Sequence, residues 1–435
     1  MAMVVKNNMS AVRTLNTLNA NSTALQKSLK NVASGMKINS AQDDASGYAI
    51  SERMRVRIRS LDQANQNTQN DASLMKTAEG AVGNTVELLR TLKEKAINAA
   101  NDSNTDEDRA TIQKEIDQFI DQVDDNALVQ FNGKYLVDGS KNNAASATKT
   151  ILLNQSLSST TELGTALTAL TSRSGDSLEI TSTDKYQVSW VANGQTFVVS
   201  GALEEGTTLG ALMEIPEIGT GLEASSAVAL DKNKFGDDVY TPDLQPGIGF
   251  ISTAAGVTNQ IAGFTISIMD SNGNVKKAAN AALDQFKQYQ RAENQTEGGS
   301  KALNFQIGSE ANVAIKVGLG DMRAEALGLK GSTGERIKVT TKDLANAAIN
   351  AIENALTKAL DQQTTIGAIE ARLEYTATNL TTSSENVQAA ESTIRDSDMA
   401  KEMTDYTKNN VLLQASQAML AQANQNSSAV LSLLQ

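Results

Sequence analysis

Apolar side chains recur at every third or fourth position along the first 36 residues of the chain. The steps alternate between four and three, which is the heptad pattern of a helix packed along one face. Gly35 and the pair Asn39–Ser40 interrupt the pattern. The sequence therefore predicts a helix that ends near Gly35, with a seam formed by Ala11, Leu15, Leu18, Ser22, Leu25, Leu29, Val32 and Met36.

A second and longer stripe follows. Ser40 and Asp43 match a capping box, which predicts a helix start. The predicted helix runs for roughly 55 residues, about 80 Å, to about Ala100. Such a length without proline favours a coiled-coil or bundle rod, and its seam carries Ile50, Met54, Leu61, Thr68, Ala72, Met75, Val82, Val86 and Leu89. A third helix is predicted after Thr105, which forms another capping box with Asp108.

The last third of the chain carries two more heptad frames, separated by a polar break at residues 395–398. The first frame contains Ile366, Ile369, Leu373, Leu380, Val387 and Ile394. The second contains Met399, Met403, Tyr406, Leu413, Leu420, Leu431 and Leu434. Polar residues fill its alternate positions, so we expect a weak apolar seam there.

The middle of the chain, residues 141–300, has a different pattern. It holds all three prolines and the only tryptophan, Trp190. Asn193–Gly194 between two alternating segments is a strong hairpin signal. Further strands are predicted at 177–181 and 264–269, and helical segments near 207–215 and 277–292. The predicted fold is mainly α: a long-helix coiled-coil or bundle rod formed by both chain ends, with an inserted α+β domain in the middle.

Composition removes several classes of function. The net charge of −12 argues against nucleic-acid binding. The chain has no cysteine and no histidine, so the commonest general base and zinc ligands are missing. Asp237–Asp238 is interpreted as a solvated loop, and Asp102–Glu107, which lacks the glycine of a calcium loop, as a helix-capping turn. We expect no enzyme activity, no catalytic or metal site and no cofactor.

The residues alone predict a cytoplasmic protein. Met1–Ser10 contains Lys6 and no apolar stretch long enough for a secretory leader. No window reaches the roughly 18 apolar residues of a membrane span.

The two ends differ from the rest of the chain in charge. Residues 1–42 contain basic but no acidic side chains, and residues 409–435 contain no charged side chain at all. A charge-free helix this rich in Gln, Asn and Ser is too polar for a bilayer and needs a surrounding of protein. A single N-terminal helix cannot cover it on all sides, so neighbouring copies must contribute. We expect the termini to polymerise, and to be helical only in the polymer; a disordered tail is the alternative.

Several blocks of the sequence resemble the bacterial flagellin family. Asn39–Arg53, Leu61–Asn65, Thr77–Gly80 and Gln130–Gly133 resemble its N-terminal part. The C-terminal part is matched by Ala389–Asp398, Met399–Met403 and Leu431–Gln435. The resemblance covers roughly residues 1–140 and 301–435. A hook–filament junction protein, which shares the terminal helices, is the rival within this group.

The resemblance implies a structural subunit that is exported and self-assembles into the flagellar filament for swimming motility. It would be secreted by type III export and lie outside the cell, which replaces the cytoplasmic prediction. It implies an inner-tube pair of helices at 1–42 and 396–435, a helical rod with a β-hairpin at 43–140 and 301–395, and an outer insert at 141–300. The implied partners are copies of itself, the flagellar cap, hook–filament junction proteins and an export chaperone, with no membrane insertion.

Two blocks locate the insert. Leu303–Gly308 and Gly320–Gly328 resemble a hairpin that directly follows the Gln130–Gly133 block in short flagellins. Because the ends of an insertion at a hairpin lie close together, we expect a chain joined from 140 to 301 to assemble still. A ligand-binding insert with Trp190 on an exposed sheet is the alternative to a core tryptophan. A peptidase insert lacks the histidines it would need.

The resemblance also implies an outside partner, a vertebrate Toll-like receptor that contacts an Arg, a Leu and a Glu of the rod. An alignment anchored at Thr77–Gly80 places Thr91, Lys95 and Glu115 at these positions. Thr91 cannot make the forked hydrogen bonds of a guanidinium, and Lys95 would bury a hydrated ammonium. We expect weak recognition, unless neighbouring rod residues compensate.

Overall fold

The computed structural model describes residues 8–140, 148–213, 222–228, 247–253, 256, 260–292 and 302–432. Its contacts divide the chain into two units. One contains Met1–Gln66, Ile307–Val313 and Thr376–Gln435, and the other contains Asn67–Gln306 and Ala314–Tyr375. Long helices dominate, and most strands lie in the middle of the chain, so the predicted fold class is confirmed.

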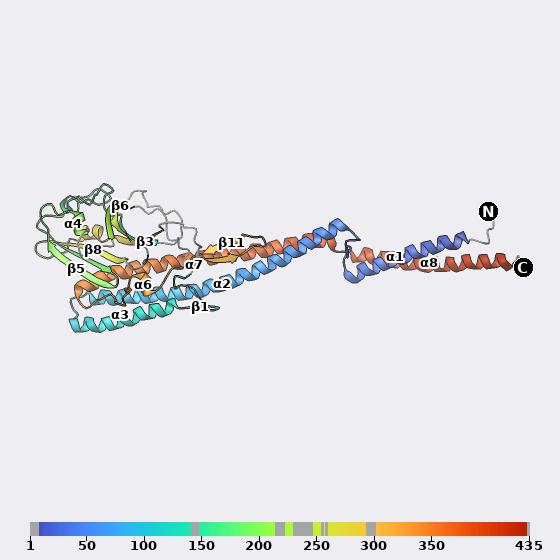
Figure 1. Cartoon of the computed structure of the whole chain (residues 1–435), viewed down its shortest axis with the longest axis horizontal. Helices are drawn as coiled ribbons and strands as arrows, with labels where there is room; N and C mark the ends of the chain where they lie inside the picture. Colours follow the sequence, from blue (N-terminus) through green and yellow to red (C-terminus); the bar gives the residue numbers. More distant parts are fainter. Residues whose placement is uncertain are drawn as a thin grey trace. The chain divides into compact units, whose positions relative to one another are not determined.

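Five helices carry most of the described residues. They are α1 (Met9–Ser34), α2 (Ala45–Ala99), α3 (Asp106–Ala127), α7 (Lys342–Arg395) and α8 (Met399–Ser432). The predicted helix breaks after the first seam and at residues 395–398 are both confirmed. In the first unit, α1 and α8 lie side by side (Figure 1).

Local capping explains where two of these helices begin and end. Gly35 ends α1 because its φ of 72° is left-handed, and its N–H donates to Asn31 O at 2.8 Å. At the start of α3, Thr105 and Asp108 form the predicted reciprocal capping box.

The predicted capping box at the start of α2 is wrong. Asp43 instead accepts the N–H groups of Asn39 and Ser40, which closes a separate turn before the helix. The cap of α2 is Asp44, whose Oδ1 accepts the N–H groups of Ser46 and Gly47 at 3.0 Å. The sequence pattern selected Asp43 because it is adjacent to Asp44, and both residues are good helix caps.

The middle segment forms two antiparallel sheets in the second unit. The first has strand order β6-β7-β3-β9 and the second β5-β4-β8. Their bounds are β3 Thr148–Asn154, β4 Lys185–Ala192, β5 Gln195–Ala202, β6 Leu222–Val228, β7 Gly247–Ser252, β8 Ile261–Met269 and β9 Phe286–Ala292. The predicted hairpin is confirmed: β4 pairs with β5 around Asn193–Gly194, both residues with positive φ.

The short helices of the middle segment are η1 (Leu167–Ala169), α4 (Leu209–Met213) and α5 (Lys277–Leu283). Two local predictions for this segment need correction. The helical segment predicted near 277–292 is present only as α5, and strand β9 takes its second half. Residues 177–181, predicted as a strand, make only the bridge Thr171–Ser177, and Glu179 has a φ of 52°.

Two small hairpins and a helical turn lie in the segments that the sequence predicts as the rod. They are β1 (Gln130–Phe131) with β2 (Lys134–Tyr135), β10 (Leu303–Gln306) with β11 (Ala314–Val317), and α6 (Ala324–Leu327). The hairpin expected from Leu303–Gly308 is therefore present.

A hydrophobic core fills the space between the two sheets. Its 22 buried residues all come from the segment between Leu152 and Phe286. Trp190 is fully buried in it and stacks on Phe197. The alternative of Trp190 as an exposed ligand platform is therefore wrong. Asp237–Asp238 lies outside the described residues.

Candidate functional site: the terminal helix pair and its joint

The contact between α1 and α8 is polar. The buried residues of α1 are Ser28 and Asn31, and Ser416 of α8 is also buried. Asn21 Nδ2 donates to Ser416 Oγ at 2.8 Å, and Asn409 Nδ2 donates to Ser28 Oγ at 3.2 Å. Amide–hydroxyl bonds thus link the two helices across their contact and fix their register.

Most of the predicted seam residues lie beside this polar contact. On α1, Leu15 and Leu29 are 45 % and 52 % exposed, and Met403 of α8 is 47 % exposed. Half-buried positions are held by Leu18, Leu25, Val32, Tyr406, Leu413 and Leu420. The side chain of Leu431 and all of Leu434 lie outside the described residues.

Other apolar side chains are open on the same helices. Each of them is at least two-fifths exposed: Met9, Val12, Met399, Val411, Leu412 and Met419. One helix pair therefore leaves exposed part of the heptad frame, at Leu15, Leu29, Met399 and Met403, together with apolar residues outside the frame. The polar contact itself was missed, although Asn21 and Ser28, like Asn409 and Ser416, repeat at seven residues.

A compact joint links the turn after α1 to the break between α7 and α8. Met36 forms a β-bridge with Asp396. Lys37 N donates to Arg395 O at 2.8 Å, and Ser397 N donates to Gly35 O at 2.9 Å. The turn after α1 and the break between α7 and α8 are thus bonded to each other, although they lie some 360 residues apart in sequence.

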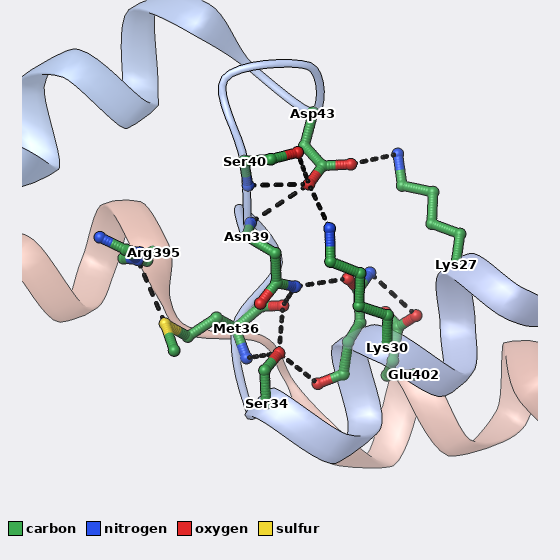
Figure 2. A network of polar contacts seen from close by, with 10 residues as sticks. Lys27, Lys30, Ser34, Met36, Asn39, Ser40, Asp43, Arg395 and Glu402 are labelled. Carbon is green, nitrogen blue, oxygen red and sulfur yellow. Dashed lines mark hydrogen bonds and ion pairs between the residues drawn. The ribbon is translucent and has the colours of Figure 1, made fainter.

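Arg395 contacts several parts of this joint, and Figure 2 shows its contact with Met36. Its side chain is buried, and Nη1 donates to Glu52 Oε1 at 2.6 Å and to Ser51 Oγ at 3.4 Å. Nε lies 3.1 Å from Met36 Sδ, and the guanidinium lies 5.4 Å from the centre of the Tyr48 ring. Hydrogen bonding to Arg395 lowers the pKa of Glu52. The planar guanidinium thereby joins α7, α2 and the turn between α1 and α2.

Asp43 is a second centre of the joint. Burial raises its pKa, but the N–H groups of Asn39 and Ser40 and nearby Lys30 outweigh burial and hold the pKa below its usual value. Lys27 and Lys30 of α1 approach its carboxylate at 3.6 and 3.7 Å (Figure 2).

An amide relay extends the joint to α8. Asn39 Nδ2 donates to Asn31 Oδ1 at 3.0 Å, and Asn31 Nδ2 donates to Glu402 Oε1 at 3.2 Å (Figure 2). The network therefore sets how α1 leaves the joint alongside α8.

The three residues of the predicted receptor region lie in the second unit. Thr91 Oγ1 donates to Glu87 O of its own helix at 3.1 Å. Lys95 Nζ is ion-paired with Glu115 Oε2, with both side chains more than a third exposed. The structure brings Lys95 and Glu115 together, so the glutamate already has a cationic partner.

The acidic turn before α3 makes structural contacts. Asp102 Oδ2 accepts from Lys342 Nζ at 2.6 Å, and Thr105 supplies the cap of α3. Among the residues that the structure describes, no group of three or more acidic side chains is placed to hold a metal ion. Within the same ranges, no helix is long and apolar enough to cross a membrane.

Comparisons with known proteins give a consistent match. A family model described as the bacterial flagellin N-terminal helical region matches residues 5–142, and one for the C-terminal helical region matches residues 349–434. A flagellin of Clostridium tyrobutyricum is 34 % identical over 97 % of this chain and 99 % of its own length. A flagellin of Bacillus subtilis is 30 % identical over 99 % of this chain and 100 % of its own. The solved structure of FliC from Burkholderia pseudomallei is 18 % identical, covers 69 % of this chain and 99 % of that one, and has a TM-score of 0.26.

Proposed function

Because the chain belongs to the bacterial flagellins and is a structural subunit of the extracellular flagellar filament, we propose that α1 and α8 are its polymerisation element. The supporting observation is the open apolar surface on both helices of a pair joined by polar contacts. Burial of such surface yields roughly 25 cal/mol per Å², and further copies of the same pair would supply the cover in the filament.

The division of labour within the pair follows from its chemistry. The bonds of Asn21 and Asn409 fix the register of α1 on α8 within one subunit. Leu15, Leu29 and Met403 then remain for contacts between subunits. In this proposal residues 1–42 and 396–435 form the inner tube, 43–140 and 301–395 the rod around it, and 141–300 the outer surface.

A double substitution tests the assignment. Leu15→Asn with Leu29→Asn should leave the helix content of the monomer unchanged, since both side chains are about half exposed there. It should abolish seeded growth of tubes seen by negative-stain microscopy. The matched control is Val275→Asn, an equally exposed apolar residue in a turn of the insert. Tubes of normal length from the double variant would show that these leucines are not subunit contacts.

The remaining partners follow from the family resemblance. We propose export through the flagellar type III apparatus without a cleaved leader, and contacts with the flagellar cap, hook–filament junction proteins and an export chaperone. The open helix pair would be shielded by the chaperone before export. A pull-down with full-length chain should capture such a chaperone, and the Leu15→Asn, Leu29→Asn variant should capture less of it.

The proposed role needs no catalysis. The buried Trp190 and the ion-paired Asp102 both act as structural residues. We therefore propose that the chain is not an enzyme. Turnover of a peptide or glycan library by the full-length chain would contradict this.

Recognition by a vertebrate Toll-like receptor is proposed to be weak. The ion pair between Lys95 and Glu115 adds to the loss of the arginine, because a receptor must break the pair before it uses the glutamate. Interface energy concentrates in a few anchors, so two lost anchors weaken binding by orders of magnitude. Thr91→Arg with Lys95→Leu should restore signalling by monomers in part. Signalling by the unmodified monomer at low nanomolar concentration would contradict the proposal.

A further inference from the structure

Helix α7 has two buried faces. One follows the heptad seam of the rod through Ala345, Ala348, Ile352, Ala355 and Ala359, all fully buried. The other contains Ala347, Ala351 and Asn354, which are also buried and recur at steps of four and three residues. A helix that served only the rod would need the first face alone.

The second face is in close contact with strand β8 of the insert. A Cβ built on Gly263 would lie 2.8 Å from Ala351 N and 3.1 Å from Ala351 Cα. The backbones of strand and helix therefore lie too close for position 263 to carry a side chain without a shift. Figure 1 shows the strands of the insert beside this part of α7.

Side chains occupy the outer edge of β8, the edge that faces away from β4. Asn354 Nδ2 donates to Ala262 O at 2.7 Å, and Asn350 Nδ2 donates to Phe264 O at 3.1 Å. Farther along the strand, Ile268 N donates to Asn280 Oδ1 at 2.7 Å. An open edge with unpaired carbonyls invites pairing with other chains, and here two amides of the rod close it.

A second contact lies at the tip of the β4–β5 hairpin. Asn193 Oδ1 accepts from Ser332 N at 2.9 Å and from Ser332 Oγ at 3.1 Å. A Cβ on Gly194 or on Gly331 would collide with backbone atoms of the other loop. Each of these two contacts between the insert and the rod part of the chain is built around a glycine, and Gln260 Nε2 of the insert also donates to Ala326 O at 3.2 Å.

We propose that the insert is a fixed brace of the rod, docked on a face of α7 made for it, rather than an appendage joined only by its linkers. Three independent features support this: the glycine contact, the two asparagine amides and the hairpin tip. The partner of this surface is the chain's own helix, so the insert and residues 347–359 of α7 open together. Subunits packed in a filament would otherwise present many copies of an open strand edge.

This inference adds a consequence to the expectation from the sequence that a chain joined from 140 to 301 still assembles. The insert has its own core, but its removal would also uncover Ala347, Ala351 and Asn354. The chain joined from 140 to 301 should therefore show faster hydrogen exchange in residues 347–359 than the full-length chain. Unchanged protection there would overturn the proposal.

A pair of substitutions in the full-length chain gives a finer test. Asn350→Ala with Asn354→Ala removes both edge bonds and adds no bulk. Hydrogen exchange should rise in β8 and in residues 347–359 together, by about tenfold for each lost bond. The control is Thr357→Ala, an exposed residue of the same helix that bonds only within it at Glu353 O. Faster exchange in β8 alone would mean that the insert opens independently, and the proposal would fail.

A bulkier side chain at Gly263 tests the glycine contact separately. Gly263→Val forces strand β8 and helix α7 apart and should speed hydrogen exchange in residues 347–359. The control is Gly367→Ala in α7, where the added Cβ meets no atom within 4 Å and should slow hydrogen exchange through better helix propensity. Equal protection of residues 347–359 in the Gly263→Val chain and the wild type would overturn the proposal.

Discussion

The terminal helix pair and the insert bury opposite kinds of residue. Between α1 and α8 the buried side chains include Ser28, Asn31 and Ser416, while large apolar side chains remain open. The insert encloses 22 apolar residues, with Phe250, Phe264 and Phe286 in mutual contact at ring distances of 4.7 to 6.3 Å. The insert satisfies its own hydrophobic surface, and the helix pair does not. The insert is therefore stable within one chain, whereas the helix pair needs other subunits to cover its apolar surface.

The largest expected change in stability comes from a cavity in the core of the insert. Phe264→Ala removes a fully buried ring that contacts two other aromatic rings. It should lower the free energy of unfolding of the insert by about 3–5 kcal/mol. Denaturant unfolding followed by fluorescence of Trp190, the only tryptophan, measures it directly.

The matched substitution in the helix pair is Leu15→Ala. It should change the stability of the monomer by less than about 1 kcal/mol, because the side chain is already half exposed. A large loss for Leu15→Ala in the monomer would erase the distinction between the two regions.

The second prediction concerns pH in the insert. Burial raises the pKa of Asp284 to about 7, against the opposing hydrogen bond from Ile266 N–H. A carboxyl whose pKa is raised on folding favours the folded state while it is protonated. The insert should therefore lose stability as pH rises from about 4 to about 7, by roughly 1 kcal/mol per pH unit.

Asp284→Asn keeps the shape and removes the titration. Its insert should unfold at the same denaturant concentration at pH 5 and pH 8 when followed by Trp190 fluorescence. A wild-type insert whose stability is equal at these two pH values would show that Asp284 does not titrate in this range.

The third prediction concerns the joint of the helix pair. Arg395→Ala leaves Glu52 without its 2.6 Å partner and removes the contacts with Met36 and Tyr48. Arg395 is buried, so the variant loses a charged hydrogen bond, although the exposure of Glu52 moderates the effect. Hydrogen exchange in residues 36–52 and 395–399 should increase by at least tenfold.

Arg395→Lys is the control for charge. A lysine keeps the positive charge but cannot donate to Glu52 and Ser51 in the planar geometry of a guanidinium. Partial protection is expected. Full protection in both variants would mean that the backbone bridge between Met36 and Asp396 is sufficient for the joint.

The sequence predicted what depends on local spacing. The heptad positions Leu61, Met75, Val82 and Leu89 are all buried in the structure. Such a seam is predictable because its residues recur at fixed spacing along one helix. The second face of α7 was not predictable in this way. Its small residues are diluted in an alanine-rich segment, and its partner, β8, lies roughly ninety residues earlier in the chain.

The joint shows the same limit. Arg395 was visible only as part of a family block, since its partners Ser51 and Glu52 lie more than 340 residues away. Likewise, the seam of the terminal helices was predicted as an assembly surface, and the polar contact within a single pair of α1 and α8 was not predicted. A pattern of apolar positions shows which surface must be covered, but not whether the same chain covers it.

The smallest expected effect is the response of the joint to acid, which should be opposite in sign to that of the insert. Burial acts to raise the pKa of Asp43, but hydrogen bonds from Asn39 and Ser40 and nearby Lys30 lower it overall, and Arg395 lowers that of Glu52. A carboxyl whose pKa is lowered on folding stabilises the folded state above its ordinary pKa, and this stabilisation is lost as pH falls below that value. Protection of residues 36–52 should therefore decrease below about pH 4, where the insert is most stable. Asp43→Asn should weaken the protection at neutral pH and reduce its dependence on acid, and exchange that is unchanged between pH 6 and pH 3 in the wild type would show that these carboxylates do not hold the joint.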